Sequence, residues 1–449
     1  MRKGFLAASV VISALAASHV GIAGVTPEEA AKLKTTLTPV GAERAGNKDG
    51  TIPAWDGGYT KPIPGATGKK IDPDPFTEDK PLLRITAKNA AQYQDKLNEG
   101  SLALLKQYPE TFRIDVYPTR RTYALQQWIY DNTFKNAANA KLTANGLSVE
   151  AAYGGIPFPI PKNGAEVMWN HTLHPRYEAL DFGFKSWVGT SDGKRSLASR
   201  TENHQTVPYY YKNEQKNWDG RYLMTRLETI DPPFKAGELL VISDSVDPKN
   251  SRQAWQYLVG QRRVRRAPTV GWDTPDFVAS GANYFDEVVG FYGPLDRYEW
   301  KLIGKREMYI PYNNNGFFNA KTDDAYAAHH LNPDKVRWEL HRVWVVEGTL
   351  APGKRHVVPK RRFYLDEDNW TVTLVDGYDA AGKLWRTSQV LSFIAPSIPL
   401  MNTDFTMVFN LQARTYAAIQ SFNEEKFLFV NHRPLSHWSG DSLGSEGVR

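Results

Sequence analysis

The chain has 449 residues, of which 41% are hydrophobic and 23% are charged, so it can bury a full core. It contains no cysteine, which excludes disulfides, zinc–thiolate sites, thiol nucleophiles and a cysteine-linked lipid anchor. The formal net charge of +6 falls to +4 without the two basic residues Arg2 and Lys3 of the export signal, and this balance is too weak to indicate nucleic-acid binding.

The N-terminus has the parts of a secretory signal peptide. An apolar stretch from Phe5 to Ala17 follows the basic start, and the small residues Gly21 and Ala23 have the spacing of a cleavage site. The stretch is shorter than the roughly 20 apolar residues that span a bilayer, so the sequence favours a cleaved signal peptide over a retained membrane anchor. We expect residues 1–23 to be cleaved near Ala23 and the mature protein to be soluble in the periplasm.

Residues 24–84 predict a short helix followed by an extended arm. The Thr-Pro-Glu-Glu sequence that starts at Thr26 has the pattern of a capped helix start. Turn-forming residues dominate from Leu37 to Gly58, where Trp55 could pin an irregular segment. The remainder of the arm is rich in Pro, Gly and Lys.

Three later segments have the apolar spacing of helices: Ala87–Gln107, Thr122–Asn145 and a stretch that starts at Thr274. The first two should lie against a sheet. The third has Pro275 at its first position and could cap the mouth of a barrel. Its apolar stripe consists of Phe277, Gly281, Tyr284, Phe285 and Val288.

Elsewhere apolar and polar residues alternate, which is typical of half-buried antiparallel strands. Examples are 112–117, 298–303, 370–374 and 405–412. Turn-forming links at 366–369 and 379–383 separate consecutive strand patterns, as in a meander of hairpins. We predict a β-rich α+β fold, with a curved antiparallel sheet or half-open barrel wrapped around helices, and a disordered tail at 438–449.

Long, ordered motifs run along the mature chain. They are Leu37–Gly58, Pro73–Phe76, Thr111–Arg121, Gly155–Pro161 and the pair Trp169–Asn170. With these motifs the chain resembles a bacterial periplasmic family of unknown function that is commonly labelled outer membrane lipoprotein-sorting protein.

That resemblance implies the half-open barrel of the LolA and LolB lipoprotein carriers, here over residues 85–437 with helical insertions. It also implies an inner-membrane exporter of the resistance-nodulation-division (RND) type and an outer-membrane protein as partners. The family has no agreed functional residues, so none is transferred to this chain.

No familiar catalytic or phosphate-binding motif occurs, so we predict a protein that is not an enzyme and has no cofactor. Asp323, Asp324, His329 and His330 could ligate a metal, but adjacent histidines of a strand point apart, and we predict no metal site.

One carboxylate pair, Asp366 with Asp368, could in principle serve a glycosidase, whose two carboxyl groups lie roughly 5 to 9.5 Å apart. Because the pair falls in a predicted hairpin turn, we expect both side chains to be solvated turn residues.

Aromatic residues make up 12% of the chain, which suits a packed β core and an apolar ligand site alike. For the second interpretation we predict that aromatic-rich sheet faces line a ligand site: Tyr298, Trp300, Trp338, Leu340, Trp344, Phe405 and Phe409. A lid would consist of Phe277, Tyr284 and Phe285.

Charged residues give two further predictions. Arg342 and Asp376 each share a strand face with apolar residues, so they could form a buried ion pair, either static or acting as a gate. The basic patch Arg262, Arg263, Arg265 and Arg266 could bind lipid phosphates or an acidic partner, or could simply protect a strand edge; the cluster Lys360–Arg362 could extend it.

Together these features predict a non-enzymatic periplasmic carrier or chaperone that binds a hydrophobic, lipid-like cargo between an inner-membrane exporter and the outer membrane. The alternatives are a secreted enzyme that acts on polysaccharide and a structural subunit of an envelope complex.

Overall fold

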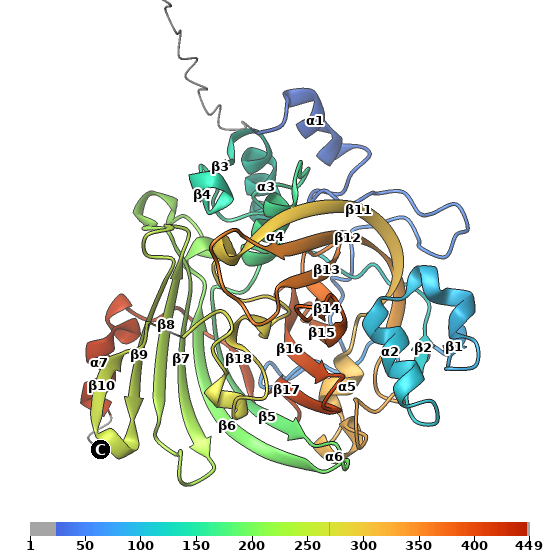
Figure 1. The fold of residues 1–449 in the computed structure, drawn as a ribbon. Coiled ribbons are helices and arrows are strands. Elements are labelled where there is room, and N and C mark those ends of the chain that lie inside the picture. The colour runs from blue at the N-terminus through green and yellow to red at the C-terminus, as the bar shows by residue number, and fades with distance from the viewer. Residues whose placement is uncertain (1–23, 269, 447–449) are drawn as a thin grey trace, which may run out of the picture.

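The computed structural model describes residues 24–268 and 270–446, and Figure 1 shows their arrangement. The signal peptide predicted at residues 1–23 lies outside this part of the chain. In the described part, no helix is long and apolar enough to cross a membrane.

A 16-stranded sheet dominates the fold, and a separate two-stranded sheet consists of β3 and β4. The strands are β1 (Leu83–Ile85), β2 (Ile114–Val116), β3 (Lys141–Thr143), β4 (Ser148–Glu150), β5 (Ala179–Gly189), β6 (Arg195–Thr206), β7 (Arg221–Asp231), β8 (Leu239–Ser245), β9 (Arg252–Leu258), β10 (Arg263–Arg266), β11 (Tyr298–Pro311), β12 (Trp338–Leu350), β13 (Lys360–Asp366), β14 (Val372–Tyr378), β15 (Leu384–Ile394), β16 (Met401–Asn410), β17 (Thr415–Ser421) and β18 (Phe427–Phe429). The helices are α1 (Pro27–Ala31), α2 (Glu99–Gln107), α3 (Gln127–Asn139), α4 (Gly164–Thr172), α5 (Asn315–Asn319), α6 (Thr322–Ala325) and α7 (Gly440–Glu446).

The large sheet is strongly curved and is not closed. Its strands follow the order β1-β2-β12-β13-β14-β15-β16-β17-β5-β6-β7-β8-β9-β10, while β11 pairs with β12 and β18 with β5. Figure 1 shows β5 to β10 as one tall wall and β11 arching over the other half. Strand β17 pairs antiparallel with β5, so the two halves form one sheet. The predicted curved antiparallel sheet is confirmed.

The predicted meander is present at the positions where turn-forming residues predicted hairpins. Strands β12 to β17 pair with their sequence neighbours, and the links 366–369 and 379–383 join β13 to β14 and β14 to β15. Both faces of this region are covered, because every residue of β14 is buried.

Two of the three predicted helices are present in shortened form. The first begins at α2 rather than at Ala87, because the Asn98 side chain accepts the N–H of Ser101 and caps the helix there. The preceding residues form the 3-10 turn η2 (Ala90–Lys96), and the second predicted helix is α3.

The long helix predicted from Thr274 is wrong. The chain forms two separate 3-10 turns, η7 (Phe277–Ala279) and η8 (Phe285–Glu287). The Asp276 side chain accepts the N–H of Val278, and Ser280 and Gly281 adopt left-handed backbone conformations with φ of 53° and 78°. These residues turn the chain back on itself, so the predicted apolar stripe does not form.

The C-terminal residues from 438 to 446, predicted as part of a disordered tail, are ordered in the structure. Residues 440–446 form α7, which packs against β9 and β10. Leu443 is fully buried in a cluster with Leu239, Val241 and Tyr257, so its burial favours the ordered helix.

Candidate functional site

A mostly apolar pocket lies between the wall of β5 to β8 with β17 and the segment 276–292 that covers it. The cavity has a volume of about 70 Å³. Its apolar lining includes Phe184, Leu227, Leu240, Ile242, Phe285 and Ile419.

Strand alternation explains why this face of the wall is apolar. Leu223, Thr225 and Leu227 are alternate residues of β7, and Leu240 and Ile242 are alternate residues of β8, so each set points to one side of the sheet. All five line the pocket. The other face of β8 carries Leu239 and Val241, which are covered by α7.

The covering segment, residues 276–292, is held to the rest of the protein at η7 and at η8. At η8, Asp286 lies between His356 Nε2, at 2.8 Å, and Arg361 Nη2, at 2.9 Å, while Arg386 Nη2 lies 2.8 Å from Glu287 Oε2. At η7, Ala279 is fully buried against Val408, Ala417 and Ile419. Ser199 donates a 2.7 Å hydrogen bond to the carbonyl of Val278.

The polar groups at the pocket include one ion pair, Arg176 with Asp404. Arg176 Nη1 lies 2.9 Å from Asp404 Oδ1, and Tyr177 donates a 3.2 Å hydrogen bond to the same carboxylate. Asp276 also lines the pocket, and burial raises the pKa of its carboxyl to about 6. A pocket of this kind can hold an apolar molecule that has a small polar group.

The structure places most of the predicted ligand residues elsewhere. Only Phe285 of the predicted set lines this pocket. Its lid neighbour Phe277 packs edge-on against it at 5.4 Å between ring centroids, and Tyr284 lies under the Arg386 guanidinium. The remaining residues are packed into the main hydrophobic core or against it: Tyr298, Trp300, Trp338, Leu340, Trp344, Phe405 and Phe409.

The predicted ligand site did not include the pocket residues of β7 and β8, because that prediction was based on aromatic side chains. The available signal was the apolar run from Leu239 to Ile242, which indicates a strand covered on both faces.

The predicted ion pair between Arg342 and Asp376 does not form. The strand register pairs Arg362 of β13 with Glu347 of β12 on one side and with Asp376 of β14 on the other. Asp376 therefore points to the same face of the sheet as Glu347 and the other odd-numbered residues of β12. Arg342 has an even number, so its side chain points to the opposite face. Arg342 Nη1 instead lies 3.3 Å from Glu367 Oε1.

Asp376 is held by the start of α2. Its carboxylate accepts hydrogen bonds from Asn98 Nδ2 at 2.7 Å, from the backbone N–H of Gly100 at 2.9 Å and from the Tyr364 hydroxyl at 3.1 Å. The proposed gate therefore has no basis, and Asp376 is an anchor for a helix N-terminus.

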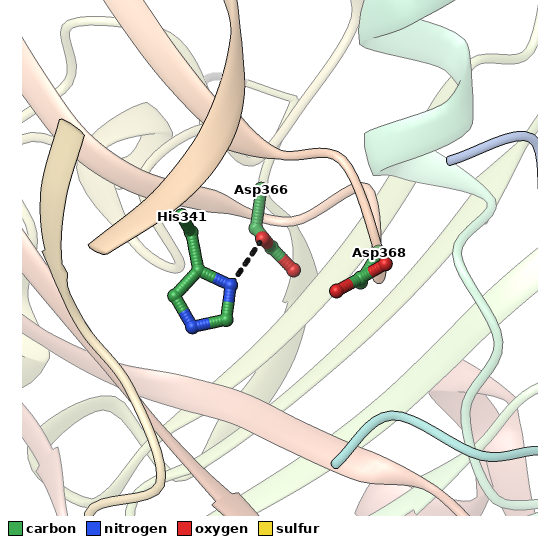
Figure 2. A group of neighbouring side chains, drawn as sticks. All are labelled: His341, Asp366 and Asp368. Atoms are coloured by element: carbon green, nitrogen blue, oxygen red, sulfur yellow. Dashed lines mark ion pairs between the residues drawn. The ribbon is translucent and has the colours of Figure 1, made fainter. Parts of the chain in front are cut away.

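A second cluster, His341, Asp366 and Asp368, has donor atoms within 4.8 Å of one another, close enough to share a metal ion (Figure 2). Asp366 and Asp368 are 0% and 2% exposed, so the prediction of solvated turn residues is wrong. The N-terminal arm covers this turn, where Trp370 Nε1 donates a 2.8 Å hydrogen bond to the carbonyl of Val40.

Cationic side chains already form ion pairs with both carboxylates of this cluster. His341 lies between Glu339, 3.0 Å from Nε2, and Asp366, 3.4 Å from Nδ1. Although burial opposes the charged form, these carboxylates raise the pKa of His341 to about 9, so the ring is protonated at neutral pH. Arg121 binds Asp368 through two hydrogen bonds of 2.6 and 2.9 Å. The arrangement is a buried ion-pair network.

The other metal-capable side chains do not converge. Asp323 pairs with Arg195 at 2.7 Å, His329 stacks on Tyr108, and His330 is hydrogen-bonded to Thr111.

The predicted basic patch lies on and just before the edge strand β10, where all four arginines are exposed. The Lys360–Arg362 cluster does not extend it as a free surface. Arg361 is buried against Asp286, and Arg362 pairs with Glu347 at 3.1 Å.

The sequence model described as "Protein of unknown function (DUF1329)" matches residues 84–444. The chain belongs to the DUF1329 family. An uncharacterized protein of Pseudomonas aeruginosa is 37% identical over 455 residues, which cover 100% of this chain and 99% of that protein. The resemblance inferred from the motifs is thereby confirmed.

Two solved structures are similar over part of the fold. A DUF1329 family protein from Desulfovibrio piger has a TM-score of 0.42 at 10% identity and covers 62% of this chain and 97% of its own. A putative outer membrane lipoprotein-sorting protein domain from Vibrio parahaemolyticus has a TM-score of 0.43 at 12% identity and covers 63% and 98%.

Proposed function

We propose that this DUF1329 member is a periplasmic carrier that binds a hydrophobic, lipid-like cargo in the pocket between the β5–β8 wall and segment 276–292. The single observation that carries the proposal is the pocket itself. Its cavity of about 70 Å³ is smaller than the roughly 300 to 1,000 Å³ of most small-molecule sites, so a cargo molecule would enter as segment 276–292 moves outward.

The lining suits reversible binding of an apolar chain. Each buried methylene contributes about 0.8 kcal/mol, so an acyl chain could bind firmly through contacts with Leu227, Leu240 and Ile242 once the covering segment has moved outward. Release would require the covering segment around η7 to move away from β6, which breaks the hydrogen bond from Ser199.

We propose a binding role rather than a catalytic one. The carboxylate pair weighed for a glycosidase, Asp366 and Asp368, is buried beneath the N-terminal arm and engaged by His341 and Arg121. A polysaccharide could not reach it without displacing the arm. Exchange of cargo with an RND-type exporter and an outer-membrane protein completes the proposal and rests on the family resemblance.

The experiment is a titration of the purified protein with a fluorescent polyene fatty acid, with native mass spectrometry of protein isolated from its own periplasm. We expect saturable binding of the probe and a retained lipid. A protein that binds no probe and carries no lipid would contradict the proposal.

A further inference from the structure

Two hairpin turns project side by side from one end of the wall. Residues 232–238 join β7 to β8, and residues 259–262 join β9 to β10 (Figure 1). A Cβ placed on Gly237 would lie 3.4 Å from Cγ2 of Val259, so the two turns are in contact.

Each turn presents an apolar side chain to solvent. Phe234 is 79% exposed and Val259 is 40% exposed. A large aromatic side chain at the tip of a turn contributes nothing to the core, and burying it against an apolar phase would be favourable.

Unpaired cations lie in the second of these turns and along the strand that follows it. Arg262, Arg263, Arg265 and Arg266 are all exposed, and no carboxylate of the described residues forms an ion pair with any of them. Arg265 donates only to the neutral Gln256, at 3.3 Å. Asp231 and Glu238 are the acids of the neighbouring hairpin, so the surface keeps an excess of positive charge.

One cation links this surface to the pocket. Lys235, next to Phe234, lies 3.3 Å from the carbonyl of Phe277 and 3.4 Å from the Ser280 hydroxyl, both in or next to η7. A partner that binds the turns would therefore lie beside η7, in the segment that covers the pocket.

We propose that the hairpin-tip surface, formed by Phe234, Val259, Arg262, Arg263, Arg265 and Arg266, docks on an anionic lipid bilayer. Phe234 and Val259 enter the interfacial region, and the guanidiniums bind lipid phosphates. The combination of projecting apolar tips with an arginine-rich flank favours a bilayer over an acidic protein, which would match the charge but leave Phe234 in water. Docking needs no cargo in the pocket, so it can be tested independently of the carrier function.

The test is cosedimentation of the mature protein with vesicles of phosphatidylcholine alone or of phosphatidylcholine mixed with phosphatidylglycerol. We expect binding to the anionic vesicles only, and weaker binding as salt is added. Replacing the four arginines by glutamine should weaken binding by about fivefold for each arginine that contacts the surface. Phe234→Ser should weaken it severalfold and leave the salt dependence unchanged.

Matched controls use exposed residues far from the tips in the fold. Leu82→Ser removes a side chain that is 73% exposed, and Lys69→Gln with Lys70→Gln removes two exposed cations; neither should change vesicle binding. Equal binding to both vesicle types, or unchanged binding of the arginine variant, would overturn the proposal and would leave an acidic protein as the partner of the arginines. A protein that binds vesicles but no fatty acid would support docking while contradicting the carrier function.

Discussion

Arg121 and Asp368 form a two-point ion pair that is almost completely shielded from water. Arg121 Nη2 lies 2.6 Å from Oδ1 and Nε lies 2.9 Å from Oδ2, and the two side chains are 2% and 3% exposed. The same guanidinium donates to backbone carbonyls of Glu43, Arg44 and Pro53. The pair therefore fastens the N-terminal arm to the turn between β13 and β14.

Removing this arginine should be strongly destabilising. We expect Arg121→Met to lower the free energy of unfolding by about 3 to 5 kcal/mol, because Asp368 would be left buried without its partner. Urea denaturation followed by circular dichroism measures the change. Lys194→Met, which breaks the exposed ion pair with Asp192, should leave stability unchanged. If both variants behave alike, the Arg121 pair does not stabilise the fold.

The protonated state of His341 predicts a pH dependence of stability. Its pKa is about 9 in the folded protein and 6.5 ordinarily, so folding strengthens proton binding. This contribution to stability is complete below pH 6.5 and is lost as the pH rises through about 9. We expect a loss of about 3 kcal/mol over this window, measured by urea denaturation at each pH.

The control for this effect is His341→Gln, which cannot be protonated. This variant should be less stable at pH 6.5 and should lose less stability toward pH 9. A variant whose pH profile runs parallel to that of the unmodified protein would show that another group is responsible.

Because Arg342 and Asp376 face opposite sides of the sheet, their contributions should be independent. Asp376→Leu leaves the start of α2 without its acceptor and should cost about 2 to 4 kcal/mol. Arg342→Met should also destabilise the protein, and the double variant should lose the sum of both to within about 0.5 kcal/mol. A double variant more stable than that sum would indicate a coupling that the structure does not show.

Filling the pocket should abolish probe binding without unfolding the protein. Val278→Trp adds a large side chain to a half-buried lining residue of η7, so we expect the affinity for the fluorescent fatty acid to fall by at least tenfold. Val357→Trp makes the same change at a residue that is 45% exposed and outside the pocket. Equal probe affinity in the two variants would place the cargo elsewhere.

Local patterns were enough to predict much of the fold. Alternation of apolar and polar residues identified strands such as 298–303 and 405–412, and turn residues identified the hairpins at 366–369 and 379–383. The capped start at Thr26 is present with both hydrogen bonds of the capping box. These features depend on residues a few positions apart, so they can be read from the chain itself.

Side-chain partners could not be predicted in the same way. Parity along β12 and β14 suggested that Arg342 and Asp376 meet, but the register of the intervening β13 places them on opposite faces. The turn at Asp366 and Asp368 has the composition of a solvated hairpin, yet an arm more than 300 positions away in the sequence covers it.

The sequence by itself therefore determined the antiparallel strands, the hairpins and the family motifs, all of which follow from local periodicity and composition. Only the tertiary structure decided which faces are covered, and so located the pocket at β7 and β8 instead of among the aromatic residues. The physical reason is that burial depends on which distant segments pack on each face, and strand order and register set this packing after the strands have formed.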